Sequence, residues 1–229
     1  MKLVEIAPDI FQLSRFGLVN CYLVREDDGL TLIDTMIPGS AGAILNAAHS
    51  LNRVLRRVAL THVHMDHIGS LDVLANRLVG VDVAVGNRES RLLLRDFHTE
   101  PTEPNTRIRG SFPKVHTIPS VLLNGREMYG SLQIIASPGH TPGHIAFFDT
   151  RTATLIAGDA LVTIGGLRVS GDASPVFPLP NWATWHKPTA VASARRLLEL
   201  RPQRIAVGHG KPILENAVPA LEHAIRHAE

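Results

Sequence analysis

The sequence has little of several features that mark particular classes of protein. Among its 229 residues there is one cysteine, Cys21, so no disulfide can form within the chain, and its apolar surroundings predict a small buried side chain. No apolar run approaches the roughly 20 residues of a membrane-spanning helix. Residues 1–24 alternate polar and apolar side chains and include Pro8 and Asp9, unlike a signal peptide with its apolar centre. We therefore expect a cytoplasmic protein without a membrane partner.

Blocks of one charge are also missing. The net charge is +2 with the histidines neutral, and the arginines are scattered along the chain, so a nucleic-acid partner is not expected. No low-complexity linker divides the sequence, and we interpret residues 1–229 as a single domain that acts on a small-molecule substrate. The sequence carries no signal for an oligomeric state. Its unusual number is 12 histidines.

Three of these histidines lie with an aspartate in the short stretch from Thr61 to Gly69. The apolar residues before it predict a buried strand, and His62 and His64 would converge because side chains two apart in a strand share a face. Asp66 stands where a helix would begin, and that turn would aim it and His67 beside the first pair. Imidazole and carboxylate suit zinc, iron or manganese, so the cluster indicates two adjacent metal sites. For this stretch alone, an exposed polar turn is the alternative.

Alternating and periodic apolar patterns predict the elements of the chain. Strands are expected over residues 3–13, 20–24, 30–34, 58–61, 81–85, 131–136, 145–149, 154–157 and 204–207, with a hairpin turn at 26–29. Helices are expected over residues 43–51, 66–80, 88–96 and 217–228, and another begins at its predicted cap, Thr189. Residues 97–120 predict a long loop, and residues 165–188 a second irregular segment. The order predicts an α/β fold, α+β in some schemes, with two sheets enclosed by helices.

Three further polar residues follow predicted strands and stand beside glycines. His140 follows the strand over 131–136, Asp159 the strand over 154–157, and His209 the strand over 204–207. Glycine lets backbone approach closely, and side chains at strand ends can converge from separate strands. Any one of these residues alone would more often be structural.

Together with the stretch from Thr61 to Gly69, these residues resemble the motifs of the metallo-β-lactamase superfamily, in the family's order and over nearly the whole chain. The resemblance implies a four-layer αβ/βα sandwich with a metal site at one edge of its two sheets. It also implies that three residues bind one metal, three bind a second and one bridges both, namely His62, His64 and His140, then Asp66, His67 and His209, and finally Asp159. The expected cofactors are two divalent metal ions, zinc before iron or manganese.

The resemblance implies a hydrolase of the glyoxalase II-like or lactonase-like branch. A hydroxide bridging the two metals would open the carbonyl of an ester or lactone, with a thioester as a further candidate. Asp66 is expected to be catalytic, because it would orient the hydroxide and pass a proton to the leaving group.

Three departures from known branches narrow the expected substrate. The chain ends 20 residues after His209, without the helical module by which glyoxalase II-type enzymes hold glutathione. Val162 stands where acyl-homoserine lactonases of the family carry a tyrosine, and true β-lactamases generally lack the aspartate found here as Asp159. We therefore expect a modest-sized, fairly apolar ester or lactone.

Other functions fit the same residues. Sulfur dioxygenases of the family bind one iron through the equivalents of His62, His140 and Asp159, and a glyoxalase II-like thioesterase is a second alternative. A binding or scaffold protein is disfavoured, because no ligand position is missing. Elemental analysis separates one iron from two zincs per chain.

Further side chains are candidates to support the site or to line its pocket. Asp34 and His144 are candidates to hold the metal ligands in place, with a turn carboxylate and simple packing as the alternatives. Aromatic residues of the two long loops are candidates to wall an apolar pocket, with packing over the core as the alternative, and they are Phe97, Phe112, Phe177, Trp182 and Trp185.

Overall fold

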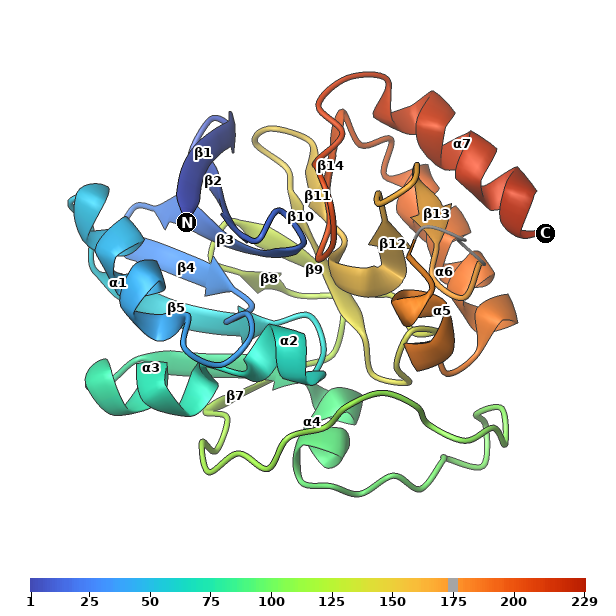
Figure 1. Ribbon diagram of the computed structural model, residues 1–229, viewed down its shortest axis with the longest axis horizontal. Helices are drawn as coiled ribbons and strands as arrows, with labels where there is room; N and C mark the ends of the chain where they lie inside the picture. Colours follow the sequence, from blue (N-terminus) through green and yellow to red (C-terminus); the bar gives the residue numbers. More distant parts are fainter. Residues whose placement is uncertain (173–176) are drawn as a thin grey trace.

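The first half of the chain builds a seven-stranded sheet whose strands lie side by side in sequence order (Figure 1). The computed structural model describes residues 1–172 and 177–229. The strands are β1 (Lys2–Ala7), β2 (Ile10–Arg15), β3 (Val19–Glu26), β4 (Gly29–Ile33), β5 (Leu55–Leu60), β6 (Asp82–Gly86) and β7 (Val121–Leu123). Pairing is antiparallel from β1 to β4 and parallel from β4 to β7. Parallel strands need crossovers, which here contain α1 (Ala41–Ser50), α2 (Met65–Ile68), α3 (Leu71–Arg77) and α4 (Asn87–Leu93).

The second half builds a five-stranded sheet in the order β14-β11-β10-β9-β8 and a two-stranded ribbon, β12-β13. Their strands are β8 (Met128–Tyr129), β9 (Leu132–Ala136), β10 (Ile145–Asp149), β11 (Thr154–Ile156), β12 (Leu161–Val162), β13 (Arg168–Val169) and β14 (Arg204–Ala206). The helices are the short 3-10 helix η1 (Gly158–Ala160), α5 (Leu179–Ala183), α6 (Lys187–Glu199) and α7 (Ala217–Ala228). No helix formed by the described residues is both long enough and apolar enough to span a membrane.

Alternation along the strands divides the interior into three apolar clusters. On β10, Phe147 packs between the two sheets while its neighbour Phe148 packs with residues of α6 and α7. On β5, Ala59 packs between the sheets while Val58 packs with residues of α1 and α3. This is the period of two expected for strands buried on both faces. The predicted four-layer arrangement, with helices outside two facing sheets, is therefore confirmed (Figure 1).

Two predicted elements are divided in the structure. Residues 3–13 form two strands rather than one, because Asp9 adopts φ 63° and the chain reverses so that Leu3 pairs with Leu13. The predicted helix over 66–80 is interrupted between α2 and α3, where Ser70 Oγ donates to the Ile37 carbonyl at 2.9 Å. Apolar periodicity continued across both breaks, so pattern alone could not locate them.

A third prediction, the helix cap at Thr189, is wrong. The N-cap of α6 is His186, whose side chain accepts a hydrogen bond from the Thr189 backbone N–H at 3.3 Å. The predicted irregular segment over 165–188 contains β13 and α5, and its residues 173–176 lie outside the described part of the chain. The hairpin turn between β3 and β4 is confirmed, and so is the last helix, α7.

An exposed glycine in α1 gives a direct test of local helix stability. A Cβ added to Gly42 would meet no atom within 4 Å. Because glycine loses more backbone entropy than alanine in a helix, Gly42→Ala is expected to raise the free energy of unfolding by about 0.5–1 kcal/mol. Urea denaturation followed by circular dichroism measures this, and a lower midpoint for the variant would contradict it.

Candidate metal centre

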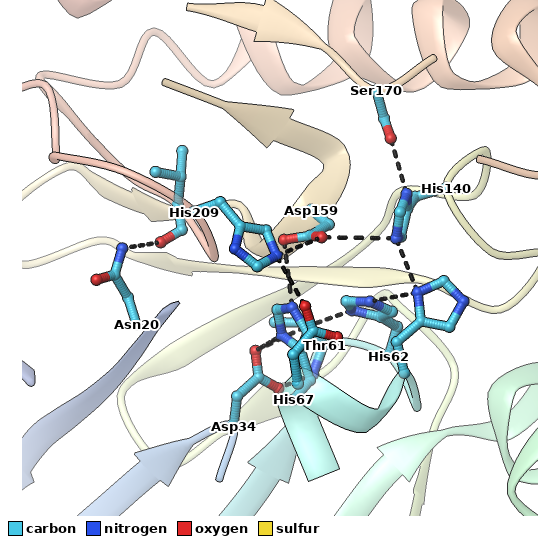
Figure 2. A network of polar contacts seen from close by, with 12 residues as sticks. Asn20, Asp34, Thr61, His62, His67, His140, Asp159, Ser170 and His209 are labelled. Atoms are coloured by element: carbon cyan, nitrogen blue, oxygen red, sulfur yellow. Dashed lines mark hydrogen bonds and ion pairs between the residues drawn. The ribbon is translucent and has the colours of Figure 1, made fainter. Parts of the chain in front are cut away.

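The residues of the predicted metal site converge at one edge of the two sheets from segments far apart in the sequence (Figure 2). Loops after β5, β9 and β14 supply histidines, and α2 and η1 supply the two aspartates and a further histidine. The residues are His62, His64, Asp66, His67, His140, Asp159 and His209. All are buried except Asp66, which is partly exposed. Loops at strand ends therefore position the site, and the sheets hold those loops in place.

Three ring nitrogens face one another in the first group, which consists of His62, His64 and His140. His64 Nδ1 lies 3.2 Å from His62 Nε2 and 3.0 Å from His140 Nε2. His64 Nε2 must carry its proton, because it lies 3.0 Å from the carbonyl oxygen of Arg109, which can only accept. His64 Nδ1 therefore presents a lone pair to the other two rings.

The tautomer of His62 follows from a short chain of hydrogen bonds. The hydroxyl of Thr61 donates to Asp34 Oδ2 at 2.8 Å, so it accepts from His62 Nδ1 at 3.0 Å. His62 Nε2 then also faces inward with a lone pair. On the third ring, His140 Nδ1 contacts the hydroxyls of Ser170 at 2.9 Å and Thr184 at 3.2 Å, which turns its Nε2 inward.

His209 and Asp66 belong to the second group, with His67. His209 Nε2 lies 3.1 Å from Asp66 Oδ2 and 3.1 Å from Asp159 Oδ2. His209 Nδ1 donates to the carbonyl of Leu18 at 3.0 Å. The loop is fixed from β3 by Asn20, whose Nδ2 donates to the carbonyls before and after His209, those of Val207 at 2.9 Å and Gly210 at 2.7 Å.

Asp34 and His144 contact the residues that they were predicted to support. Asp34 Oδ2 accepts from His67 Nδ1 at 2.7 Å, and Asp34 Oδ1 accepts from the backbone N–H of Thr61 at 2.8 Å. His144 Nε2 accepts from the backbone N–H of Asp159 at 3.2 Å. Metal-binding histidines commonly donate the N–H of their second ring nitrogen to a carboxylate, as His67 does to Asp34.

Asp159 lies between the two groups. Its Oδ1 is 3.3 Å from His67 Nε2, and its Oδ2 is 3.1 Å from His209 Nε2 and 3.6 Å from His140 Nε2 (Figure 2). Neither Asp159 Oδ1 nor His67 Nε2 has a hydrogen-bond partner among the described residues, although both are buried. Unsatisfied buried polar atoms are costly, so this pair calls for a partner beyond those residues, such as a bound cation.

The donor set fits divalent cations. Three groups offer ligand atoms within 4.8 Å of one another, namely His62, His64 and His140, then His62, His67 and Asp159, and then Asp66, His67 and His209. Inward lone pairs at hydrogen-bond distance repel unless a cation lies among them, and nitrogen with carboxylate oxygen is the ligand set of zinc and related metals. We conclude that these residues can bind divalent metal.

The first group (His62, His64 and His140) and the second group (Asp66, His67 and His209) differ in the pKa values of their histidines. Burial lowers the pKa of His62 and His140 well below the usual value, and it lowers the pKa of His64 to about 4. Burial acts in the same direction at His209 and His67, but neighbouring carboxylates together outweigh it. Asp159 and Asp66 raise the pKa of His209 to about 10, and Asp159 and Asp34 raise that of His67 well above its usual value. The first group therefore offers neutral rings, and the second pairs its rings with carboxylates.

A cavity of about 580 Å³ opens in front of the site. Its apolar lining includes Leu18, Ile37, Met65, Phe177 and Trp182. Phe177 and Trp182, two of the residues predicted to line a pocket, are thus part of the lining of this cavity. No lysine or arginine lines this cavity in the described part of the chain.

The predicted pocket residues Phe97 and Trp185 do not line this cavity. Phe97 packs on Phe112, with ring centroids 5.0 Å apart, and both border a separate cavity of about 680 Å³ formed by the long loop. Trp185 is buried, and its indole N–H donates to the carbonyl of Thr106 at 3.1 Å. Trp185 therefore packs in the core, which was the alternative given for it, whereas Phe97 is 37% exposed beside the separate cavity.

Several contacts of the site were not predicted from the sequence. The carbonyls of Leu18 and Arg109 orient His209 and His64, and the hydroxyl of Ser170 contacts His140. Backbone carbonyls leave no sequence signal. Asn20 did leave one, because a polar residue inside an apolar strand needs partners for its amide.

Comparison with known proteins agrees with the fold. The family model of the metallo-beta-lactamase superfamily matches residues 14–209. The chain is 46% identical over 224 residues to the uncharacterised protein YobT of Bacillus subtilis (strain 168), covering 96% of each chain. It is 29% identical to YflN of the same organism, described as a probable metallo-hydrolase, covering 86% of this chain and 82% of that one.

A solved structure extends the comparison to the fold. DIM-1 metallo-beta-lactamase, exposed to ceftazidime, superposes with a TM-score of 0.71 at 16% identity, over 99% of this chain and 95% of that one. At this identity the likeness concerns the fold alone. With the family match over most of the sequence, these findings establish that the chain belongs to the metallo-beta-lactamase superfamily.

Proposed function

We propose that this metal-dependent hydrolase holds two divalent cations, zinc in the first place, and opens the carbonyl of a small, neutral ester or lactone. The position of Asp159 carries the proposal, because one carboxylate faces His67 and His209 of the second group and also His140 of the first. Two adjacent sites that share a carboxylate are the arrangement of binuclear hydrolytic centres.

Different residues of the protein would bind each cation and orient the binding side chains. His62, His64 and His140 would hold one cation and Asp66, His67 and His209 the other, with Asp159 between them. When bound, two such cations polarise a carbonyl oxygen and lower the pKa of a water molecule from about 15.7 towards 7. Asp34, His144 and the Arg109 carbonyl keep the ligand rings and Asp159 in orientation.

Asp66 is the proposed proton carrier. Burial would raise its pKa, but the hydrogen bond with His209 and the charges of His67 and His209 together outweigh burial and hold the pKa of Asp66 below its usual range. Asp66 is therefore ionised, and its side chain is 34% exposed at the cavity. The carboxylate would take a proton from the attacking water and return it to the alkoxide that leaves when the acyl C–O bond breaks.

The cavity supports a neutral and largely apolar substrate. Leu18, Ile37, Phe177 and Trp182 offer apolar surface next to the ligand residues. Because no arginine or lysine of the described residues lines the cavity, a substrate carboxylate would lack a cationic partner there. The volume of about 580 Å³ suits a modest-sized molecule.

Elemental analysis followed by a substrate panel tests this function. Protein purified without added metal is expected to contain two zinc ions per chain and to hydrolyse neutral esters and lactones faster than charged thioesters. Chelation should abolish turnover and lower the melting temperature by about 10 °C, because metal at about 1,000 times its Kd stabilises the folded state by about 4 kcal/mol.

Added zinc should restore both the activity and the melting temperature. One iron per chain together with thiol-dependent oxygen consumption would instead favour the dioxygenase alternative, which would use His62, His140 and Asp159. Turnover confined to glutathione thioesters would overturn the proposed substrate class while leaving the hydrolase intact.

A further inference from the structure

Glu89 is a buried carboxylate whose position is not explained by charge pairing. It lies in α4, and its exposed fraction is 0%. No lysine, arginine or histidine nitrogen of the described residues forms an ion pair with it. A buried carboxylate without a cation is expensive, so its hydrogen bonds must have a specific use.

Its hydrogen bonds join the two segments that supply the first group of histidines. Glu89 Oε1 accepts from the backbone N–H of Val63, the residue between His62 and His64, at 3.0 Å. Glu89 Oε2 accepts from the hydroxyl of Thr141, the residue after His140, at 2.8 Å. The two oxygens of one side chain thus hold the segments that carry His64 and His140, two residues that are 76 positions apart in the sequence.

A third hydrogen bond and a close backbone contact fix the second of these segments. Glu89 Oε2 also accepts from the backbone N–H of Gly143 at 3.1 Å. A Cβ on Gly143 would lie 2.1 Å from the backbone nitrogen of Glu89, so α4 and this segment approach as closely as only glycine permits. The close packing of α4 against the segment around Gly143 therefore fixes the position of Glu89.

We propose that Glu89 is a positioning residue that sets the separation of the three inward nitrogens of His62, His64 and His140 before a cation binds. The inference rests on the proposed function and names a determinant of one half of its metal site. Among the described residues, Glu89 forms no hydrogen bond with any of the three rings, and it would act through its hydrogen bonds with Val63, Thr141 and Gly143.

Glu89→Gln is the sharpest variant. Glutamine keeps the size of the side chain, but its NH₂ group would face at least one N–H or O–H donor that the carboxylate accepts. Two backgrounds isolate the groups, since His209→Ala keeps the first group complete and His64→Ala keeps the second. In each background, zinc affinity is measured by competition with a chromophoric chelator.

In the His209→Ala background, Glu89→Gln is expected to weaken zinc binding about 10–100-fold, the usual effect of losing a residue that orients ligands. In the His64→Ala background the same change should leave the affinity within about twofold. Equal losses in both backgrounds would indicate general loosening of the fold, and no loss in either would remove Glu89 from the site; both outcomes overturn the proposal.

Two further variants keep the test decisive if Glu89→Gln does not fold. Thr141→Val removes one of the three donors and should give a smaller loss, again confined to the first group. Asn20→Ala is the matched control, because Asn20 holds the His209 loop and should affect the second group alone. Failure of Thr141→Val to change the affinity would overturn the proposal.

The unmutated protein in the same titration reports on the proposed function. If it binds no zinc, the proposed function fails, and the positioning role fails with it. If it binds zinc and Glu89→Gln binds equally well in the His209→Ala background, only the positioning role of Glu89 fails.

Discussion

Asp159→Ala is expected to abolish turnover while the protein stays folded. Asp159 contacts His67 and His209 of the second group and His140 of the first, so its loss separates the two halves of the site. We expect turnover to fall on the order of a thousandfold or more, as for other groups that act directly on the reacting centre. Asp159 is not a member of the apolar clusters that form the core, so circular dichroism should be unchanged.

Asp159→Asn separates charge from shape in the same experiment. Asparagine fills the same space but cannot hold two cations by charge, and we expect a loss of turnover nearly as severe as with alanine. Metal content, measured together with ester or lactone hydrolysis, should fall below that of the unmutated protein. Full turnover in either variant would refute the arrangement of two cations around a shared carboxylate.

Gly208→Ala is expected to damage the same site without touching a ligand residue. A Cβ at this position would stand 2.1 Å from Asp159 Oδ1 and 2.6 Å from His67 Cε1. Its backbone is not in the left-handed region, so alanine meets no conformational barrier and the effect is steric. Displacing reacting groups by about 1 Å costs about a hundredfold in rate.

The matched control is Gly42→Ala, where the added methyl group meets nothing. Turnover of the two variants on one substrate gives the comparison, with Gly42→Ala expected at the unmutated rate. Near-normal turnover by Gly208→Ala would mean that Asp159 and His67 can shift without consequence. It would also weaken the role assigned to Asp159.

The candidate ligand residues could be predicted from the sequence because they lie at or just after the ends of strands, and His140, Asp159 and His209 also stand beside glycines. His62, His64, His140 and His209 needed only the end of a strand to be located. The residues that orient them were harder to find. Asp34 was a candidate, but the carbonyl of Arg109 belongs to a loop without a period, and its place depends on tertiary packing.

The elements of the fold also differ in how well the sequence predicts them. Alternation predicted both sheets because strands buried on two faces have a strong apolar pattern, as with Phe147 and Phe148. The two-residue strands β8, β12 and β13 were missed because they are too short to carry a pattern. The break between α2 and α3 depends on Ser70 meeting Ile37, a contact between residues 33 apart.

The hydrogen bonds of Asn20 have a consequence for how the protein acquires activity. They join β3 to the His209 loop across 187 and 190 residues, so the loop that carries His209 is placed only after the chain has closed almost end to end. Contacts between such distant residues form late, because loop closure must precede them. We therefore expect hydrolytic activity to arise only once the His209 loop is in place, so a chain in which only the first sheet has formed should be inactive.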